Sequence, residues 1–556
     1  MISVYRLVKQ AEAAEFFGLN RLGLGEVGGA ASRFCSIIRR SRAHTYRRDW
    51  QSMVESTAGE TLLWSSLRAV LVASLALWPL LMLQRGWEGA VSSRWRMRTI
   101  AVAVFPFFLP ELLTGFHYRI EAAVWAAKLA PGWNAVFAEG LYGLLQLLRA
   151  VSAGSIVLLL LPRNPGVRSS LHTWDLLRAK LSWRVWLAGR LRLLLTDVFP
   201  APLAAWSVMA LMVFQEFETA ALLQIDRHPL AWTVWMFDAH AARQPLHESL
   251  KIVAGPLAVE LLLLLPLVLV IGTLRGAGSV VQSMVVAGEQ RVASRGVRMQ
   301  VAAYGLLGGL VLLGFPGWRM GAEAVSGVWL LLGTARLFQQ TVAQVLTSTL
   351  VSAAAAVAAF AVCGLLTNRF RTESRGSGWT VGLCILALLP GLAGSLAISL
   401  TLLSLFQTPF FRPLYDTWLP LVLGQLLGVL PRAFALQLLL GRFVGSESIS
   451  TAEQLTGSSS VVVRGRGAGI LWRLVDVRWL GGLLLLTQWC FWDVTSTSVL
   501  RPMSPEPAVT RLYNEMHFAR TEVLLGLTVL SAVSPGMLFL VVMVVSRVWR
   551  KKRTRS

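Results

Sequence analysis

The chain has 556 residues, of which 55% are hydrophobic and 15% charged, and its formal net charge is +23. A soluble domain has about 25% charged residues, so the composition excludes an ordinary set of soluble domains. In a soluble protein the positive charge would suggest nucleic-acid binding, but here the arginines lie in short segments beside apolar runs, as the positive-inside rule for membrane proteins predicts. The sequence therefore predicts a polytopic membrane protein in a lipid bilayer, with no nucleic-acid partner.

A basic leader occupies residues 1–60, without the apolar core of a cleavable signal peptide. Apolar runs of membrane-spanning length follow, since about 20 residues of helix cross roughly 30 Å of hydrocarbon. The eleven runs cover residues 62–83, 99–117, 136–161, 197–223, 250–273, 299–315, 341–366, 378–404, 416–441, 475–497 and 523–546. The predicted fold class is all-α.

Residues 214–243 have a second copy at 491–520, offset by 277 positions with no gap. Both copies end in -H-x-A-R-, and the acid Glu216 falls on Asp493. The identical pairs are Phe214/Phe491, Leu223/Leu500, Ala231/Ala508, Thr233/Thr510, His240/His517, Ala242/Ala519 and Arg243/Arg520. We interpret the chain as two tandem lobes, residues 61–275 and 299–546, joined by a linker at 276–298.

Span counting predicts the orientation of the lobes. The first lobe has five spans and the second six, because 299–315 has no counterpart in the first. Six spans separate the two copies, so both point to the same side of the membrane and the repeats are parallel. The basic loops at 163–196 and 442–474 and the tail at 547–556 then share one side, predicted to be the cytoplasm. This count leaves the basic leader outside, unless a helix was missed or the true start lies upstream.

The two long cytoplasmic loops have the same plan: a short amphipathic helix, a small residue, then a basic segment. With residues 215–223 and 388–406, they resemble the fused two-lobed inner-membrane permeases of binding-protein-dependent ABC importers, the group of ferric-iron and thiamine permeases. In that family an E-A-A-x-x-x-G loop in each lobe docks on an ATPase subunit. The matching positions are Thr173, Trp174, Asp175 and Ala179 in the first loop, and Thr451, Ala452, Glu453 and Gly457 in the second. Threonine replaces the family glutamate in both loops, and the glycine is present only in the second.

The resemblance implies the permease subunit of an importer for ferric iron or another small solute, multi-pass in the inner (plasma) membrane. It implies an ATPase partner, expected as a dimer that binds the ATP, and an extracytoplasmic solute-binding protein. The chain itself has no P-loop and no zinc-hydrolase or serine-hydrolase motif, so we expect neither enzyme activity nor a cofactor or metal of its own.

Acids inside apolar runs are the candidates for the translocation path. An ionised carboxylate there costs several kcal/mol unless it faces water or a partner. The candidates are Glu216, Glu218 and Asp493, with Glu260 also within a run. The competing interpretation is a hydrogen bond between helices that fixes their packing.

The repeated histidine and arginine are candidates for the external face. There, His240, Arg243, His517 and Arg520 would contact a solute-binding protein or the substrate, or simply anchor the chain at the interface. Two other functions stay open at this point: a membrane-embedded enzyme acting on lipid-linked substrates, and a non-transporting scaffold derived from a permease.

Overall fold

A computed structural model describes residues 28–553 apart from short gaps. The gaps are 91, 127, 129–130, 162–166, 179, 181, 195–197, 224–230, 242–245, 274–293, 373–377, 444–445, 459, 473–476 and 518–520. By its internal contacts the chain divides into two units, Met1–Glu60 and Thr61–Ser556. Both predicted lobes lie in the second unit, and most of the predicted linker 276–298 lies outside the described residues.

The described residues form helices and no strands, which confirms the all-α prediction. In hydrocarbon the backbone must satisfy its own N–H and C=O groups, and a helix does so within one segment. Among the described residues, seven helices are long and apolar enough to cross a membrane, or up to nine if each of two bent pairs is one span. The seven are Ala58–Glu88, Val136–Leu160, Val253–Val270, Arg295–Gly333, Ala335–Thr367, Leu419–Leu440 and Thr521–Val548. These helices indicate a membrane-embedded protein, with seven to nine candidate spans in the described part of the chain, and the predicted number of eleven stays a prediction.

Two predicted spans, 99–117 and 378–404, are bent. The first breaks between η1 (Phe105–Phe108), which follows α3 (Ser93–Val104), and α4 (Glu111–Ala126), with a bend of 74°. Pro110 explains this break, because a proline disfavours helical backbone in the residue before it, and Leu109 is extended. The second lies between α15 (Gly378–Leu392) and α16 (Ser395–Phe406), with a bend of 94°. Gly394 permits it, since its φ of +92° suits glycine.

Two further predicted spans, 197–223 and 475–497, are interrupted. Helices α8 (Pro200–Phe214) and α20 (Val477–Phe491) have 15 residues each. At about 1.5 Å per residue they reach roughly 22 Å, less than a bilayer core. The chain then continues as the short helices α9 (Glu218–Leu223) and α21 (Val494–Leu500). The predicted acids Glu216 and Asp493 lie at these interruptions.

We call residues 61–275 the first half and residues 299–546 the second half, after the two predicted lobes. The order of helices in the first half recurs in the second. Besides the helices already named, the first half contains α5 (Pro131–Leu160), α6 (Val167–Leu177), α7 (Trp183–Leu193), α10 (Trp232–Ala241) and α11 (Leu246–Thr273). In the same order, the second half contains α17 (Leu419–Phe443), α18 (Ser446–Thr456), α19 (Val461–Leu471), α22 (Ala508–His517) and α23 (Thr521–Arg553). The bounds of α20 equal those of α8 plus 277 at both ends, which is the offset between the two copies in the sequence.

The predicted span 299–315 lies in a longer segment, α12 (Arg295–Gly309), η5 (Leu310–Gly314) and α13 (Phe315–Gly333). The first element, α12, packs on the first half, where the Tyr304 hydroxyl donates to the carbonyl of Leu148 on α5 at 3.2 Å. The last element, α13, packs on α23 in the second half. There Gly327 approaches so closely that a Cβ would lie 2.0 Å from the Glu522 carbonyl oxygen. Small residues allow such close packing of membrane helices.

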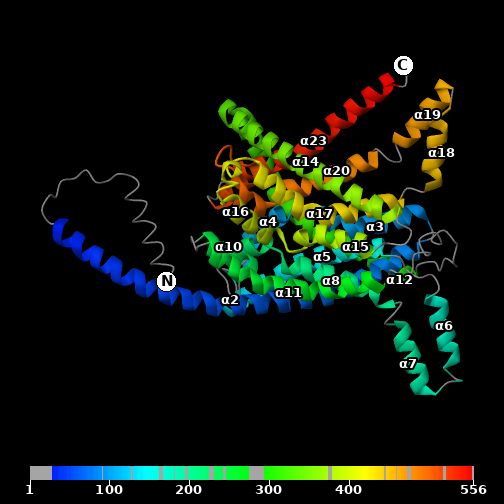
Figure 1. Cartoon of the computed structure of the whole chain (residues 1–556), viewed down its shortest axis with the longest axis horizontal. Helices are drawn as coiled ribbons and strands as arrows, with labels where there is room; N and C mark the ends of the chain where they lie inside the picture. Colours follow the sequence, from blue (N-terminus) through cyan, green and yellow to red (C-terminus); the bar gives the residue numbers. More distant parts are fainter. Residues whose placement is uncertain are drawn as a thin grey trace. The chain divides into compact units, whose positions relative to one another are not determined.

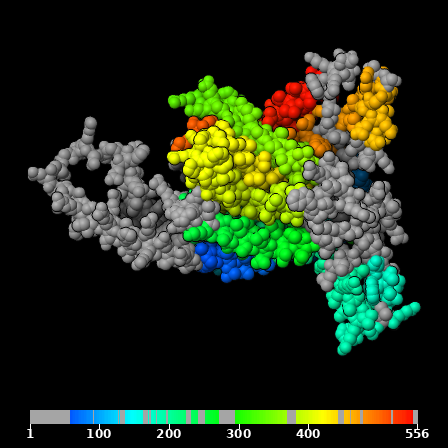
Figure 2. All heavy atoms as spheres, viewed as in Figure 1, coloured from blue at the N-terminus to red at the C-terminus, as the bar shows by residue number. Residues whose placement is uncertain are grey.

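Two helical hairpins, α6–α7 and α18–α19, occupy equivalent places in the helix order. In Figure 1 both project from the same end of the second unit, and α10 lies toward its other end. Figure 2 shows α6–α7, in cyan-green, and α18–α19, in orange, as separate projections. The remaining helices are α2 (Gly28–Glu88), α14 (Ala335–Thr372) and the short η6 (Arg412–Leu414).

Candidate functional site

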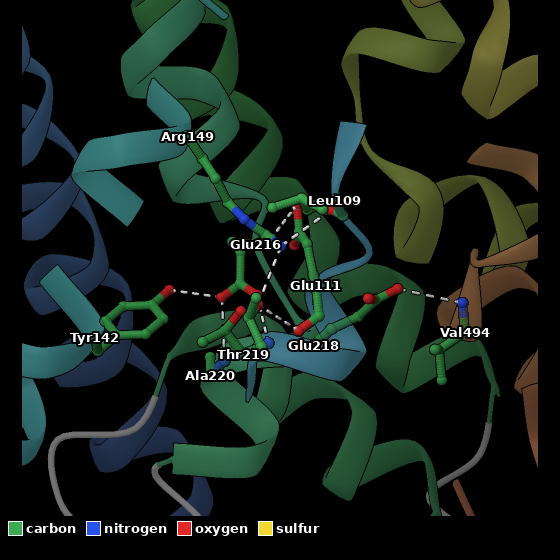
Figure 3. Close-up of polar contacts among 10 residues, drawn as sticks. Leu109, Glu111, Tyr142, Arg149, Glu216, Glu218, Thr219, Ala220 and Val494 are labelled. Carbon is green, nitrogen blue, oxygen red and sulfur yellow. Dashed lines mark hydrogen bonds and ion pairs between the residues drawn. The ribbon is translucent and has the colours of Figure 1, made fainter. Parts of the chain in front are cut away.

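The helix interruptions of the two halves meet each other. The Glu218 carboxylate, at the start of α9, accepts a hydrogen bond from the Val494 amide at 3.3 Å (Figure 3). The Gln215 amide, just before it, donates to the Leu392 carbonyl at the α15–α16 break. Broken helices that meet at mid-span are typical of the binding sites of transporters.

Glu216 caps the interrupted helix of its own half. Its carboxylate is 5% exposed and accepts from the Tyr142 hydroxyl at 2.8 Å, from the Ala220 amide at 3.1 Å and from the Thr219 amide (Figure 3). The first amides of a helix have no intrahelical partner, so a side-chain acceptor stabilises the helix start. All three donors are in the first half. The bond from Tyr142, on α5, joins two helices, which is the packing role that the sequence offered as the alternative to a place on the translocation path.

Asp493 has the matching role in the second half. Its Oδ1 accepts from the Ser496 amide at 3.0 Å and caps α21. The two acids that align at the sequence offset of 277 thus cap the short helices that follow α8 and α20. Glu218, rather than Glu216, is the acid that bonds across the halves.

Arg149 places a positive charge beside these acids. The side chain, on α5, is 2% exposed, and its Nη1 lies 2.7 Å from the Glu111 Oε1. Its Nη2 donates to the Leu109 carbonyl at 3.2 Å and the Thr114 hydroxyl at 3.3 Å. These partners flank the break before α4, so Arg149 satisfies the carbonyl exposed by the break and pairs its own charge (Figure 3).

A second arginine, Arg432 on α17, lies between the halves. Its guanidinium is 5.8 Å from the centre of the Phe107 ring in the first half and 5.6 Å from that of Trp489 in the second. It interacts electrostatically with Asp493 and Glu218. The side chain is exposed although it belongs to a candidate span. The two rings beside its guanidinium come from both halves.

We name these residues the inter-half cluster: Glu111, Arg149, Glu216, Glu218, Arg432 and Asp493. It has four carboxylates and two guanidinium groups, so it suits a solute that is cationic or rich in hydrogen-bond donors. Within the described part of the chain, no three or more His, Cys, Asp or Glu side chains are grouped to hold a metal ion. Glu260, on α11 and 2% exposed, joins the cluster through Gln215, whose Nε2 lies 3.4 Å from its Oε1.

The candidate coupling residues lie in the two hairpins. In the first, Thr173 and Asp175 are exposed, and Asp175 pairs with Arg190 at 3.0 Å. Trp174 is half-buried against Gly189, and Ala179 is outside the described residues.

In the second hairpin Thr451, Glu453 and Gly457 are exposed and Ala452 is buried. A Cβ at Gly467 would lie 2.7 Å from the Thr456 amide nitrogen. In each hairpin, a glycine in the second helix therefore allows close contact with the first helix.

Of the external-face candidates, the structure describes the side chain of His240. It is half-buried near the end of α10, and burial lowers the pKa of its imidazole. His517 ends α22, but its side chain and both arginines, Arg243 and Arg520, lie outside the described part.

Sequence reasoning missed both arginines of the cluster. Arg149 and Arg432 lie inside the apolar runs 136–161 and 416–441, which is the same signal that singled out the acids. Tyr142 gave no such signal, because a tyrosine in an apolar run is ordinary. Its role follows from the position of Glu216.

Comparisons of the chain with protein-family models, with curated proteins and with solved structures give no match.

Proposed function

We propose that the protein is the permease subunit of an ATP-binding-cassette importer, with the translocation path between its two halves. The observation that carries this proposal is the pair of hairpins α6–α7 and α18–α19, at equivalent places in the helix order and at the same end. A separate ATPase needs rigid contacts on both halves to turn its own closure into a rocking of one half against the other. Two equivalent hairpins suit that task.

The inter-half cluster supports a path at this place. Charged side chains inside a membrane mark solute or ion pathways when they face a water-filled space, and Arg432 is exposed, with rings of both halves beside its guanidinium. The excess of carboxylates favours a cationic solute, and ferric iron is a candidate cargo because hard cations prefer oxygen ligands.

The proposal includes two parallel repeats, a location in the inner (plasma) membrane and two kinds of partner. An ATPase dimer, which itself binds the ATP, docks on the hairpins, and a solute-binding protein delivers cargo on the opposite side. The recurrence of helix order and the common offset of 277 for α8 and α20 support the repeat.

Affinity purification of the tagged chain from its native membrane, with mass identification of the retained proteins, tests the proposal. We expect a P-loop ATPase. Gly467→Leu should release it, because the side chain would displace α19 from α18, whereas Gly465→Leu should retain it, because a Cβ there has open space within 4 Å. Absence of an ATPase from well-folded wild type purified in mild detergent would contradict coupled import.

A further inference from the structure

One face of α7 packs on α6. The Trp186 Nε1 donates to the Trp174 carbonyl at 2.9 Å, the Trp174 ring lies against Gly189, and Arg190 pairs with Asp175. Gly189 and Arg190 follow Trp186 by three and four positions, so both lie on the same side of the helix as Trp186. The rest of α7 is turned away from its hairpin partner.

The outer surface of α7 is apolar and basic. Val185 is 54% exposed, Leu191 46% and Trp183, at the start of the helix, 68%. Arg184 is exposed among them, and its guanidinium lies 5.8 Å from the centre of the Trp183 ring. Arg184 and Leu191 are seven positions apart and share one face of the helix, so charged and apolar side chains lie together on it. Leucine, valine and tryptophan in such a helix can enter the boundary of the acyl chains at a membrane interface. Arginine can bury its stem and keep its charge at the headgroups.

The equivalent hairpin does not have this character. Between Val167 and Leu193 the sequence has six basic residues and one acid, whereas residues 446–471 have two arginines and two glutamates. Docking on an ATPase would concern both hairpins, so it gives no reason for this difference in charge. A negatively charged partner that binds the first hairpin alone would explain the difference.

The position of α7 identifies that partner. The apolar helix α8 begins at Pro200, only a few residues after α7 ends at Leu193, so α7 lies next to the point where the chain enters an apolar helix. In Figure 1 α7 runs across the direction of α8 and α11 and extends beyond them. With the bilayer normal along α8 and α11, a helix in that orientation would lie along the bilayer surface.

We propose that α7 binds anionic phospholipid headgroups and anchors the first half to the bilayer surface. Its apolar side chains enter the acyl boundary, while Arg184 and the exposed Lys180 lie at the lipid phosphates. This anchoring does not depend on the ATPase-driven transport proposed above.

Photo-crosslinking of the full-length protein tests the anchor. A benzophenone amino acid replaces Val185 in α7, or Val462, which is the position 277 residues later in α19 and is also exposed, at 66%. The protein is placed in nanodiscs of phosphatidylcholine, with or without phosphatidylglycerol, and adducts are identified by mass. We expect lipid adducts at position 185 that rise severalfold with phosphatidylglycerol, and no such rise at position 462.

Arg184→Gln and Lys180→Gln should each reduce the phosphatidylglycerol-dependent yield about fivefold, as expected for one cation near an anionic surface. Equal yields at the two positions, or a yield at 185 that ignores phosphatidylglycerol, would overturn the anchor. So would an adduct at 185 to an ATPase instead of lipid in native membranes. Size-exclusion profiles identical to wild type verify that each variant folds.

Discussion

The Glu218 carboxylate accepts a hydrogen bond from the Val494 amide at 3.3 Å, although 276 positions separate the two residues. This bond joins the first half to the start of α21, a helix that Asp493 caps from within the second half. A rocking of one half against the other would have to break it. Glu218 is thus placed to stabilise one arrangement of the halves.

Removing this acceptor should weaken the joint. Glu218→Ala removes the bond across the halves and leaves the Val494 amide only its local 2.9 Å bond to the Trp492 carbonyl, so we expect a loss of about 0.5–1.5 kcal/mol, the net value of one hydrogen bond. Glu218→Gln keeps a carbonyl acceptor and should cost less. Thermal unfolding of the purified chain measures both, with Glu453→Ala, an exposed acid on α18, as the control. Equal losses from the Ala and Gln variants would refute the hydrogen bond as the stabilising contact.

Arg149 should stabilise the folded protein mainly through its ion pair with Glu111. Arg149→Met removes the partner at 2.7 Å and leaves a carboxylate without its counter-charge, at a cost of about 3 kcal/mol. The double variant Arg149→Met with Glu111→Gln should recover the part of this loss that comes from the unpaired Glu111 carboxylate. The Leu109 carbonyl and the neighbouring Glu216 and Glu218 would still lack the guanidinium. Folded yield and melting temperature of the three variants in detergent test the pair. A double variant no better than the single one would show that the pair is not the reason.

The close approach of α13 to α23 predicts a position-specific effect of side-chain size. Gly327→Val places atoms against the Glu522 backbone and should destabilise by about 3 kcal/mol, the upper end for overpacking. Gly321→Val lies on the same helix, where a Cβ has open space, and controls for the lower helix propensity of valine. Melting temperatures in detergent should fall for the first variant and change little for the second.

His240 should make stability depend on pH. Because burial lowers its pKa in the folded protein, the unfolded chain takes up a proton first as the pH falls below about 6.5. Its stabilising contribution is therefore present above that pH and lost as the pH falls toward the folded pKa. Melting temperatures of wild type should drop more between neutral and mildly acidic pH than those of His240→Gln. Parallel pH profiles would contradict a buried neutral imidazole.

The sequence was sufficient to predict the membrane class and the helical fold, because apolar runs of this length have few other structures available in a bilayer. Hydropathy could not predict the breaks. The run 99–117 stays apolar through Leu109 and Pro110, so its average is unchanged where its backbone turns. The proline and Gly394 were themselves the signals, since each favours a non-helical backbone at one position.

The site was predictable in part. Charge inside an apolar run identified the acids, and the same rule applied to arginines would have added Arg149 and Arg432. Which acid crosses between the halves depends on side-chain direction at a helix start, and sequence spacing does not specify it. In the sequence it is Glu216 that aligns with Asp493, whereas the carboxylate that bonds to the other half belongs to Glu218.

The most direct test of the central claim is the mass of the intact complex purified from native membranes in mild detergent. If one chain supplies both halves of the path, each 60.9 kDa chain should be found with two ATPase subunits, one per hairpin. A complex with two copies of this chain for two ATPase subunits would mean that one chain supplies only one half. A chain that retains no ATPase would contradict the permease assignment itself.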